Sequence, residues 1–311
     1  MAMKVLVTGA AGFIGSNLVK RLSTVAEVRG IDDLSTGYMR NIEGLNIDFI
    51  EGSILDEDVL KIAVQGCDAI VHLAARPSVP RSLAEPQKSH EANATGTLKV
   101  LNAARELNDP IVVVASSSSV YGANPNLPKS ENMLPMPMSP YAVSKLAAEQ
   151  YTLAWQYSYG MKTLPFRFFN VFGPNQAPDH DYAAVVPTFI ASALRGKTLH
   201  INGDGLQSRD FTYVGTVCDV IAEAITQRIS CNGPVNLAFG TRTSLLEIIE
   251  ILEKIMVQSL RVNHGEDRVG DVRHSQADNS VLKRLFPNVQ PVSLEDGLRT
   301  TVKWLESHLS D

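Results

Sequence analysis

The sequence has few cysteines, and they form no pattern. The three cysteines, Cys67, Cys218 and Cys231, are widely separated and make neither a CxxC motif nor a Cys/His ligand spacing. The seven histidines are not paired as metal ligands usually are. The sequence therefore predicts neither a disulfide framework nor a metal site, and we expect the cysteines to be small apolar residues in a reducing compartment.

Long apolar runs and basic clusters are also missing. No stretch approaches the roughly 18 apolar residues that a membrane-spanning helix needs. The 33 acidic residues outnumber the 28 basic ones, and no segment is dense in Lys or Arg. We therefore expect no membrane span and no nucleic-acid partner. The sequence starts MAMKVLVTG and enters a strand with no signal peptide before it, which favours a cytoplasmic protein.

Short apolar strands alternate with helices in the first half of this chain of 311 residues. The alternation is typical of an α/β, Rossmann-type fold, a doubly wound parallel sheet that binds ligands at the carboxyl ends of its strands. We expect a ligand-binding sheet domain over residues 1–172 and a smaller α/β lobe over residues 173–311, with some exchange of strands and helices. Strands are expected at residues 4–8, 27–31, 47–51, 69–74, 111–115 and 163–169, and helices at residues 16–23, 93–107, 139–159, 185–194, 214–227, 244–255 and 294–307, with one more ending near residue 64.

Three glycines follow the first strand at the spacing of a dinucleotide-binding loop. Gly9 allows a tight turn, Gly12 lets a pyrophosphate approach the backbone at the helix start, and Gly15 lets helix and strand pack closely. Asp32 ends the second strand about 20 residues later, where a carboxylate accepts the ribose hydroxyls of adenosine and repels a 2′-phosphate. The pattern predicts NAD, with Asp33 as a second candidate. The alternative is that the glycines and the two Asp residues only make turns.

The segment SPYAVSKLAAEQ predicts a helix that carries Tyr141 and Lys145 on one face. Ser139 and Pro140 suit a helix start, and residues four apart lie above one another on a helix. A phenol titrates near about 10 and is a poor base at neutral pH, but a neighbouring ammonium favours the phenolate. The pair is therefore a candidate for proton transfer, although this spacing also recurs by chance.

Four serines, residues 116–119, follow the strand at residues 111–115. They are therefore expected at the ligand-binding edge of the sheet. A serine here can hydrogen-bond both a substrate hydroxyl and the Tyr141 phenol. The alternative is a polar start to a loop.

Eight stretches, taken together and in this order, resemble the extended short-chain dehydrogenase/reductases, and among them the nucleotide-sugar 4-epimerases. Each stretch alone is moderately specific, but the set covers nearly the whole chain. The stretches are TGAAGFIGSNL, HLAA, NATGT, SSSSVYG, SPYAVSK, RFFNVFGP, SRDFTYV and GDVRHSQAD.

The resemblance implies catalytic roles for Ser117, Tyr141 and Lys145. Tyr141 would be the base, and Lys145 both its pKa partner and a ligand of the nicotinamide ribose. Ser53 departs from the Asp that the family often has beside the adenine, which puts adenine affinity in question. The further NAD contacts that the resemblance implies are Phe13, Ile14, Ser53, Ile54, Leu73, Ala74, Ala75, Asn93, Ser116 and Phe168.

The resemblance also implies a UDP-sugar substrate. Arg209 and Arg268 match diphosphate ligands of the family, although an isolated arginine is usually a solvated surface charge. Ser275 aligns with a gate at the sugar C2 substituent, where Ser leaves room for an N-acetyl group; alternatively it is a polar loop residue. The remaining substrate contacts that the resemblance implies are Ser78, Ser117, Ser118, Asn170, Gln176, Ala184, Val185, Ile201, Asn202 and Asp271.

The expected function is that of an isomerase, an NAD-dependent UDP-hexose 4-epimerase acting on UDP-glucose and UDP-galactose and also on UDP-N-acetylhexosamines. A UDP-glucuronate 4-epimerase stays open, because Arg76 or Arg81 could hold a C6 carboxylate. A 4,6-dehydratase is disfavoured, because Ser118 and Ser119 stand where the family's dehydratases have Asp-Glu. A non-enzymatic NAD-binding regulator is disfavoured because such proteins commonly lose the Tyr or the Lys.

Two long helices, at residues 93–107 and 139–159, correspond to the helices that form the dimer interface in relatives. The sequence itself shows only that both carry apolar stripes, with Leu98 and Leu101 on the first and Leu146 on the second. We expect a homodimer that uses these helices.

Overall fold

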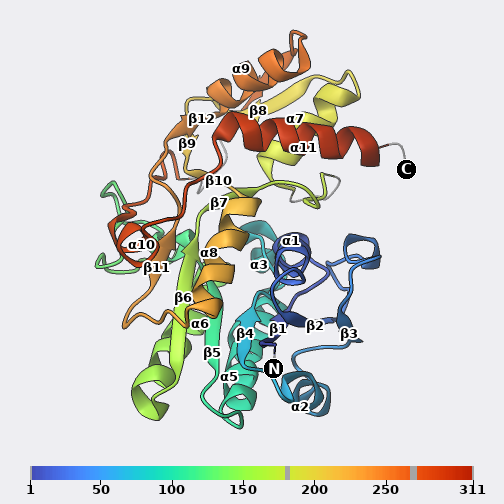
Figure 1. Ribbon diagram of the computed structural model, residues 1–311. Coiled ribbons are helices and arrows are strands. Elements are labelled where there is room, and N and C mark those ends of the chain that lie inside the picture. The colour runs from blue at the N-terminus through green and yellow to red at the C-terminus, as the bar shows by residue number, and fades with distance from the viewer. Residues whose placement is uncertain (1, 179–182, 267–271, 310–311) are drawn as a thin grey trace.

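The computed structural model describes residues 2–178, 183–266 and 272–309. At its centre lies a seven-stranded parallel sheet with the strand order β11-β6-β5-β4-β1-β2-β3 (Figure 1). The predicted Rossmann-type α/β fold is therefore confirmed. The strands of this sheet are β1 (Lys4–Thr8), β2 (Glu27–Asp32), β3 (Asp48–Glu51), β4 (Ala69–His72), β5 (Ile111–Ser117), β6 (Lys162–Phe168) and β11 (Val235–Leu237).

Helices cover both faces of the sheet (Figure 1). Helices α1 and α8 pack with one set of strand side chains, and α2 and α5 with the other. The helices are α1 (Phe13–Leu22), α2 (Glu57–Val64), α3 (Val79–Ala84), α4 (Pro86–His90), α5 (Gly96–Ala104), α6 (Pro140–Tyr159), α7 (Val185–Leu194), α8 (Val214–Thr226), α9 (Leu245–Met256), α10 (Ser280–Leu285) and α11 (Leu294–His308), with shorter turns η1 (Met39–Asn41), η2 (Glu91–Thr95) and η3 (Ser118–Tyr121).

Side chains alternate across the central strands and feed two separate layers. In β1, Val5 and Val7 join the cluster that contains α1 and α8, whereas Leu6 joins the cluster that contains α2 and α5. All three are fully buried, as parallel strands with helices on both faces should be. The strand order reverses between β1 and β4, and such a reversal is where doubly wound sheets bind their ligands.

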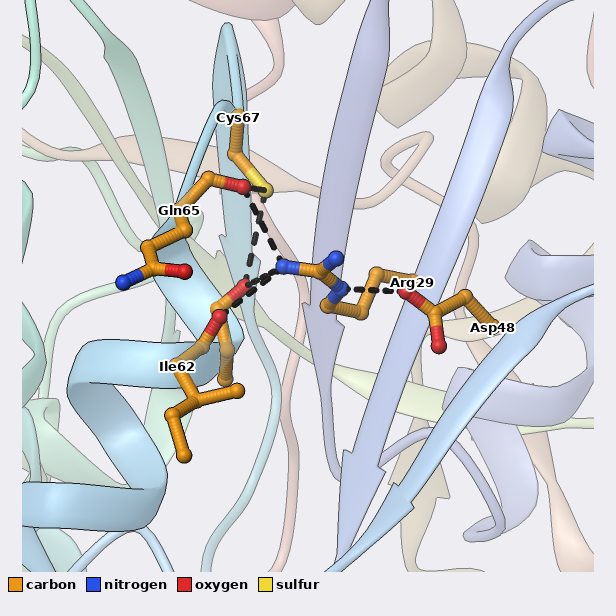
Figure 2. Close-up of polar contacts among 6 residues, drawn as sticks. Arg29, Asp48, Ile62, Gln65 and Cys67 are labelled. Atoms are coloured by element: carbon orange, nitrogen blue, oxygen red, sulfur yellow. Dashed lines mark hydrogen bonds and ion pairs between the residues drawn. The ribbon is translucent and has the colours of Figure 1, made fainter.

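Arg29 of β2 ties the sheet to the end of α2 (Figure 2). Its Nε lies 2.6 Å from Oδ2 of Asp48, and its Nη1 donates to the carbonyls of Ile62 and Gln65 at 2.9 and 3.1 Å. The last carbonyls of a helix have no partner inside the helix, so the guanidinium satisfies them. Cys67 lies beside these carbonyls, and burial raises the pKa of its thiol to about 11, as for an unreactive structural cysteine.

A second core lies in a lobe at one end of the molecule, where α7, α9 and α11 gather (Figure 1). Short strand pairs frame it: β8 with β13, and β7 with β10. Strand β9, which comes between β8 and β10 in the chain, pairs with β12. These strands are β7 (Asn170–Phe172), β8 (Leu199–Asn202), β9 (Ser208–Arg209), β10 (Phe211–Tyr213), β12 (Thr243–Ser244) and β13 (Val262–Gly265).

The two cores do not divide the chain at one point. Strand β11 joins the main sheet beside β6, and α8 packs against the sheet with α1. Leu282 of α10 and the following Phe286 are buried in the same cluster. Parts of residues 173–311 therefore complete the sheet domain, and only the remaining parts form the lobe.

The expected helix at residues 93–107 is divided. The π-helical turn η2 comes first, and α5 then ends at Ala104. Leu101 is fully buried among the side chains of α2 and the sheet, so this part of the expected apolar stripe faces the protein's own core. Within the residues that the structure describes, none of the helices combines the length and apolarity that crossing a bilayer requires.

Candidate active site

The glycine loop between β1 and α1 fits the backbone of a dinucleotide. Gly9 has a φ of +71°, and a Cβ there would lie 2.7 Å from the backbone nitrogen of Ala74. A Cβ on Gly15 would lie 1.9 Å from the carbonyl oxygen of Gly9. Gly12 occupies the cap position of α1, and no side chain caps the helix. The first turn, which begins with Phe13 and Ile14, therefore offers its N–H groups to an anion.

Asp32 lies beside this loop and is almost fully buried. Its Oδ2 accepts the N–H of Ala11 and its Oδ1 accepts the N–H of Leu34, both at 2.9 Å. Burial raises the pKa of its carboxyl, and these backbone hydrogen bonds lower it. An ionised carboxylate has about four acceptor sites, so sites remain for two ribose hydroxyls. Asp33 is exposed and accepts from Ser35 within its own turn, so it is not brought to the loop.

Ser53 and Ile54 follow β3 at the same edge. The N–H of Gly52 donates to the carbonyl of Asp32 at 2.9 Å, which fixes this segment beside the acidic residue. The Ser53 hydroxyl accepts the N–H of Leu55 at 3.2 Å. Ile54 is buried in the layer of α2 and α5, so the pair supplies one hydroxyl and one apolar surface at the place expected for adenine.

The strand end that carries HLAA is fixed by a buried polar network. The N–H groups of Leu73 and Ala74 donate to the Thr8 hydroxyl at 3.2 and 3.1 Å. Nδ1 of His72 lies 2.7 Å from the same hydroxyl, and burial lowers the pKa of this imidazole to about 3. His72 is therefore a neutral structural residue, and Ala75 follows the segment that it holds.

Asn93 connects this segment to the catalytic helix. Its Oδ1 accepts the N–H of Arg76 at 2.7 Å, and its Nδ2 donates to the hydroxyl of Ser144 at 2.9 Å. Ser144 lies in α6 between Tyr141 and Lys145. The Asn93 side chain is buried, so its role in the structure is to hold the wall of the crevice against α6.

The start of α6 is built as the sequence predicts. Ser139 caps the helix and accepts the N–H of Ala142 at 3.1 Å, and Pro140 stands in the first turn. The N–H of Tyr141 donates to the Ser82 hydroxyl of α3 at 3.0 Å. The Ser117 side chain lies near the Tyr141 phenol and acts to lower its pKa. The structure thus brings the expected base and the expected hydroxyl close to each other.

The expected effect of Lys145 on Tyr141 is not found. Burial raises the pKa of the Tyr141 phenol, and only the Ser117 side chain acts to lower it. Lys145 is buried, and its Nζ donates to the carbonyl of Ala115 at 2.8 Å. Burial lowers the pKa of this ammonium to about 8. The spacing predicts the shared helix face correctly, but the ammonium is held by the Ala115 carbonyl and does not act on the pKa of the phenol.

Two neighbouring residues have other surroundings. Ser116 is buried and donates its hydroxyl to Oε2 of Glu149 at 2.7 Å, so any cofactor contact from Ser116 would come from its backbone. Phe168 ends β6 directly beside Ser117 in the sheet register. Its ring is largely buried in the first core.

A cavity of about 260 Å³ lies in the lobe. Seven residues expected to contact substrate line it: Asn170, Gln176, Ala184, Val185, Ile201, Asn202 and Arg209. The lining residues that the sequence analysis missed are Val171, Phe172, Ala183, Val186, His200, Gln207, Phe211 and Leu245. Most of the missed side chains belong to apolar stretches that look like core, and only the polar His200 and Gln207, next to predicted positions, gave a usable signal.

Two polar groups of this cavity are suited to a polar ligand. The Arg209 Nη1 donates to the carbonyls of Ser208 and Arg273 at 2.9 and 3.2 Å, which fixes the guanidinium at the cavity wall. Oε1 of Gln176 is buried and has no hydrogen-bond partner among the described residues. A buried acceptor without a donor is costly, so this oxygen is a place for a ligand N–H or O–H.

Among the described residues, four other expected substrate contacts are not part of the cavity lining: Ser78, Ser117, Ser118 and Ser275. Ser78 caps α3 by accepting the N–H of Arg81 at 3.3 Å, with a φ of 100°. Ser118 opens η3, directly after Ser117. The N–H of Ser275 donates to the Ser208 carbonyl at 3.0 Å, which places it next to the strand of Arg209. Arg268 and Asp271 lie outside the described residues. The described residues contain no group of three His, Cys, Asp or Glu that could hold a metal ion.

Comparisons with known proteins agree with this geometry. A sequence profile of the NAD dependent epimerase/dehydratase family matches residues 5–238. The UDP-glucose 4-epimerase of Mycolicibacterium smegmatis is 34% identical over 318 residues, which cover 98% of this chain and 99% of that protein.

Solved structures are similar over the whole chain. The UDP-N-acetylglucosamine 4-epimerase of Methanobrevibacter ruminantium M1, in complex with UDP-N-acetylmuramic acid, has a TM-score of 0.94 at 38% identity and covers 99% of both chains. The UDP-glucuronic acid 4-epimerase of Bacillus cereus, in complex with UDP-glucuronic acid and NAD, has a TM-score of 0.90 at 33% identity, with 98% of this chain and 100% of that chain covered. This protein therefore belongs to the NAD dependent epimerase/dehydratase family of extended short-chain dehydrogenase/reductases, and its cofactor is NAD.

Proposed function

We propose that the protein is a UDP-hexose 4-epimerase, an isomerase that inverts the configuration at C4 of the sugar. The observation that carries the proposal is the placement of the Ser117 side chain near the Tyr141 phenol, with Lys145 one helical turn away. These groups lie at the sheet edge that carries the glycine loop. The lobe cavity with Arg209 supplies a cationic side chain of the kind that binds a diphosphate.

NAD and the protein divide the chemistry between them. When bound, NAD supplies a reversible hydride acceptor for C4 of the sugar. The Tyr141 phenolate removes the proton of the C4 hydroxyl, while the Ser117 hydroxyl holds the C4 oxygen. Lys145 would bind the nicotinamide ribose beside this pair. The 4-keto sugar turns over while its UDP group stays anchored, so that C4 takes the hydride back on its opposite face. Tyr141 returns the proton to the C4 oxygen, and no atom is gained or lost.

Proton transfer is the step that the protein must assist most. Burial raises the pKa of Tyr141, so the phenolate is scarce near neutral pH unless neighbouring groups stabilise it. The Ser117 side chain does so directly. Lys145 lies on the same helix face, but its ammonium donates to the Ala115 carbonyl and does not lower the pKa of the phenol.

The proposed substrates are UDP-glucose and UDP-galactose, and also UDP-N-acetylglucosamine and UDP-N-acetylgalactosamine. Small side chains support the wider range, because Ser275 and Ala184 leave room where a bulky residue would exclude an acetamido group. Oε1 of Gln176, which has no hydrogen-bond partner in the part of the chain that the structure describes, can accept a donor from the substrate. Relatives that carry the names of UDP-glucose and UDP-N-acetylglucosamine 4-epimerases support the same range.

Epimerisation of UDP-glucuronate is the second candidate, supported by the similarity to the Bacillus cereus enzyme. It needs a cation for the C6 carboxylate. Arg76, one of the two arginines considered for this role, is paired with Glu85, so part of its charge is already neutralised. A 4,6-dehydratase is disfavoured by Ser118 and Ser119, which provide no carboxylic acid to expel a C6 hydroxyl.

Separate incubations with UDP-glucose, UDP-N-acetylglucosamine and UDP-glucuronate test the proposal, with the C4 epimers resolved by NMR or chromatography. We expect inversion of the first two substrates. Inversion of UDP-glucuronate alone would favour the second candidate, and a 4-keto-6-deoxy product would favour a dehydratase. Tight binding of NAD without inversion of any UDP-hexose at C4 would favour a regulatory protein.

We also propose that the protein is cytoplasmic and forms a homodimer through α5 and α6. Support for the dimer comes from the exposed aromatic side chains of α6, where Tyr151, Tyr157 and Tyr159 reach solvent. Sedimentation velocity tests this assembly: a monomer at micromolar concentration would contradict it.

A further inference from the structure

A buried ion pair lies beneath the catalytic groups and has no role in the reaction described above. Glu149 of α6 is 0% exposed and Arg167 of β6 is 2% exposed. Nη2 of Arg167 lies 2.7 Å from Oε1 of Glu149, and its Nε lies 2.9 Å from Oε2. The Ser116 hydroxyl of β5 donates to the same Oε2 at 2.7 Å. The carboxylate therefore binds donors from two neighbouring strands.

The position of Glu149 along α6 relates it to the active site. It comes eight residues after Tyr141 and four after Lys145, so all three lie on one face of the helix. Its partner Ser116 directly precedes Ser117 in β5. A rotation or a slide of α6 would thus change the contacts of Glu149 and the Tyr141–Ser117 distance together.

Arg167 is held from its other side as well. Its guanidinium carbon lies 4.7 Å from the ring centre of Tyr121. The Tyr121 hydroxyl donates to Oδ1 of Asn236 in β11 at 2.6 Å, inside the protein. The guanidinium therefore cannot follow the helix if α6 moves, and it acts as a fixed point for Glu149.

Stability alone does not explain this pair. Removing two charges from water is costly, and well-packed apolar residues of similar size often stabilise a core as well as a buried ion pair does. A carboxylate that accepts three directed hydrogen bonds has one favourable orientation, whereas apolar contacts allow small shifts. What the pair adds is a defined placement of α6 on β5 and β6.

We propose that Glu149 is a positioning residue that acts through Ser116 and Arg167. It sets the rotation and height of α6, and so the distance between the Tyr141 phenol and the Ser117 hydroxyl on which proton transfer depends. The effect on proton transfer rests on the proposed epimerase function, whereas the effect of Glu149 on the placement of α6 does not.

Two variants test this role. Glu149→Gln keeps the shape but loses the charge and one acceptor oxygen. The double variant E149L/R167M replaces the pair by apolar side chains that should keep the core stable. We expect both to lower kcat at least about tenfold while KM for the UDP-sugar stays within about threefold, because small misplacements of reacting groups are costly. We also expect faster backbone hydrogen exchange at residues 116–121 and 140–145.

Thr152→Val is the matched control, because it removes a different buried polar group of α6. The Thr152 hydroxyl donates to the Ala148 carbonyl at 2.8 Å. It should leave kcat and the exchange pattern nearly unchanged. A stable double variant with wild-type kcat would overturn the proposal, as would a loss of activity that only follows the folded fraction. If neither Glu149 variant folds, Arg167→Lys takes their place, since it keeps the charge but loses the two-pronged contact.

Failure of the proposed function would look different. In that case the wild-type protein would invert no UDP-hexose. Hydrogen exchange alone would then test whether Glu149 positions α6. Faster exchange in both segments of the double variant would support the positioning role, and unchanged exchange would contradict it.

Discussion

The two sides of the candidate site are built in different ways. The catalytic side stands on the seven-residue strand β5 and the twenty-residue helix α6, both packed into the sheet domain. The side proposed to bind the nucleotide, called the nucleotide side below, is made from strands of two to four residues and the loops between them. The first arrangement fixes atoms for chemistry, and the second shapes a surface for recognition. Changes on the catalytic side should therefore lower kcat, and changes on the nucleotide side should raise KM.

Tyr141→Phe gives the largest expected effect. The variant removes the proposed base and nothing else, so kcat should fall by about 10²-fold or more. The melting temperature and the KM for the UDP-sugar should stay close to those of the wild type, because the phenol oxygen contributes at most one hydrogen bond to the fold. Steady-state kinetics and a thermal melt measure both. A variant that keeps more than about a tenth of the wild-type rate would remove Tyr141 as the base.

Arg209→Gln tests the nucleotide side. Hydrogen bonds to charged groups contribute about 1.5–3 kcal/mol, so the loss of a diphosphate contact should raise KM by roughly 10- to 100-fold with little change in kcat. Arg273→Gln is the control, because this exposed side chain pairs with Asp204 and does not line the cavity. A fall in kcat alone for Arg209→Gln would break the division between the two sides.

The same division explains what the sequence could predict. Apolar runs and their alternation with helices gave the sheet, and the glycine spacing with Asp32 gave the cofactor loop, because each depends on neighbours in the chain. The strand-end rule predicted that the serines at residues 116–119 would face the ligand site, and the resemblance to a family selected Ser117 as the partner of Tyr141. These features have a local signal, which is why they could be read directly.

The nucleotide side has little local signal. Arg209 and Asn170 meet at the cavity because β7 pairs with β10, over 40 residues away. No periodicity in the sequence encodes that pairing, and the resemblance to a family supplied it. The direction of the Tyr141 pKa also could not be read from spacing, because it depends on how much water the folded protein removes from the phenol.

Ser117→Ala should give a smaller effect with a distinctive pH dependence. The Ser117 side chain acts to lower the pKa of Tyr141, so the loss of its hydroxyl should raise that pKa and move the acidic limb of the kcat/KM profile to higher pH. The rate near neutral pH should fall about tenfold or more. Ser117→Thr keeps the hydroxyl, so the acidic limb of its kcat/KM profile should stay at the wild-type pH. An unshifted limb in the alanine variant would mean that Ser117 does not tune the base.

His72→Gln should change stability rather than rate, because its buried imidazole is hydrogen-bonded to Thr8 and Thr97 within the sheet domain. Burial holds the pKa of this imidazole at about 3, against 6.5 as its ordinary value. Between these values the unfolded chain binds a proton that the folded protein does not, so the free energy of unfolding falls as the pH drops below 6.5. The slope from this group is at most about 1.4 kcal/mol per pH unit. Urea unfolding should show that the free energy of unfolding falls less between pH 7 and pH 5 in His72→Gln than in the wild type. His308→Gln, at an exposed position of α11, should leave the loss unchanged. An equal loss in the His72 variant would mean that the buried network beneath the cofactor loop does not set the acid sensitivity of the sheet domain.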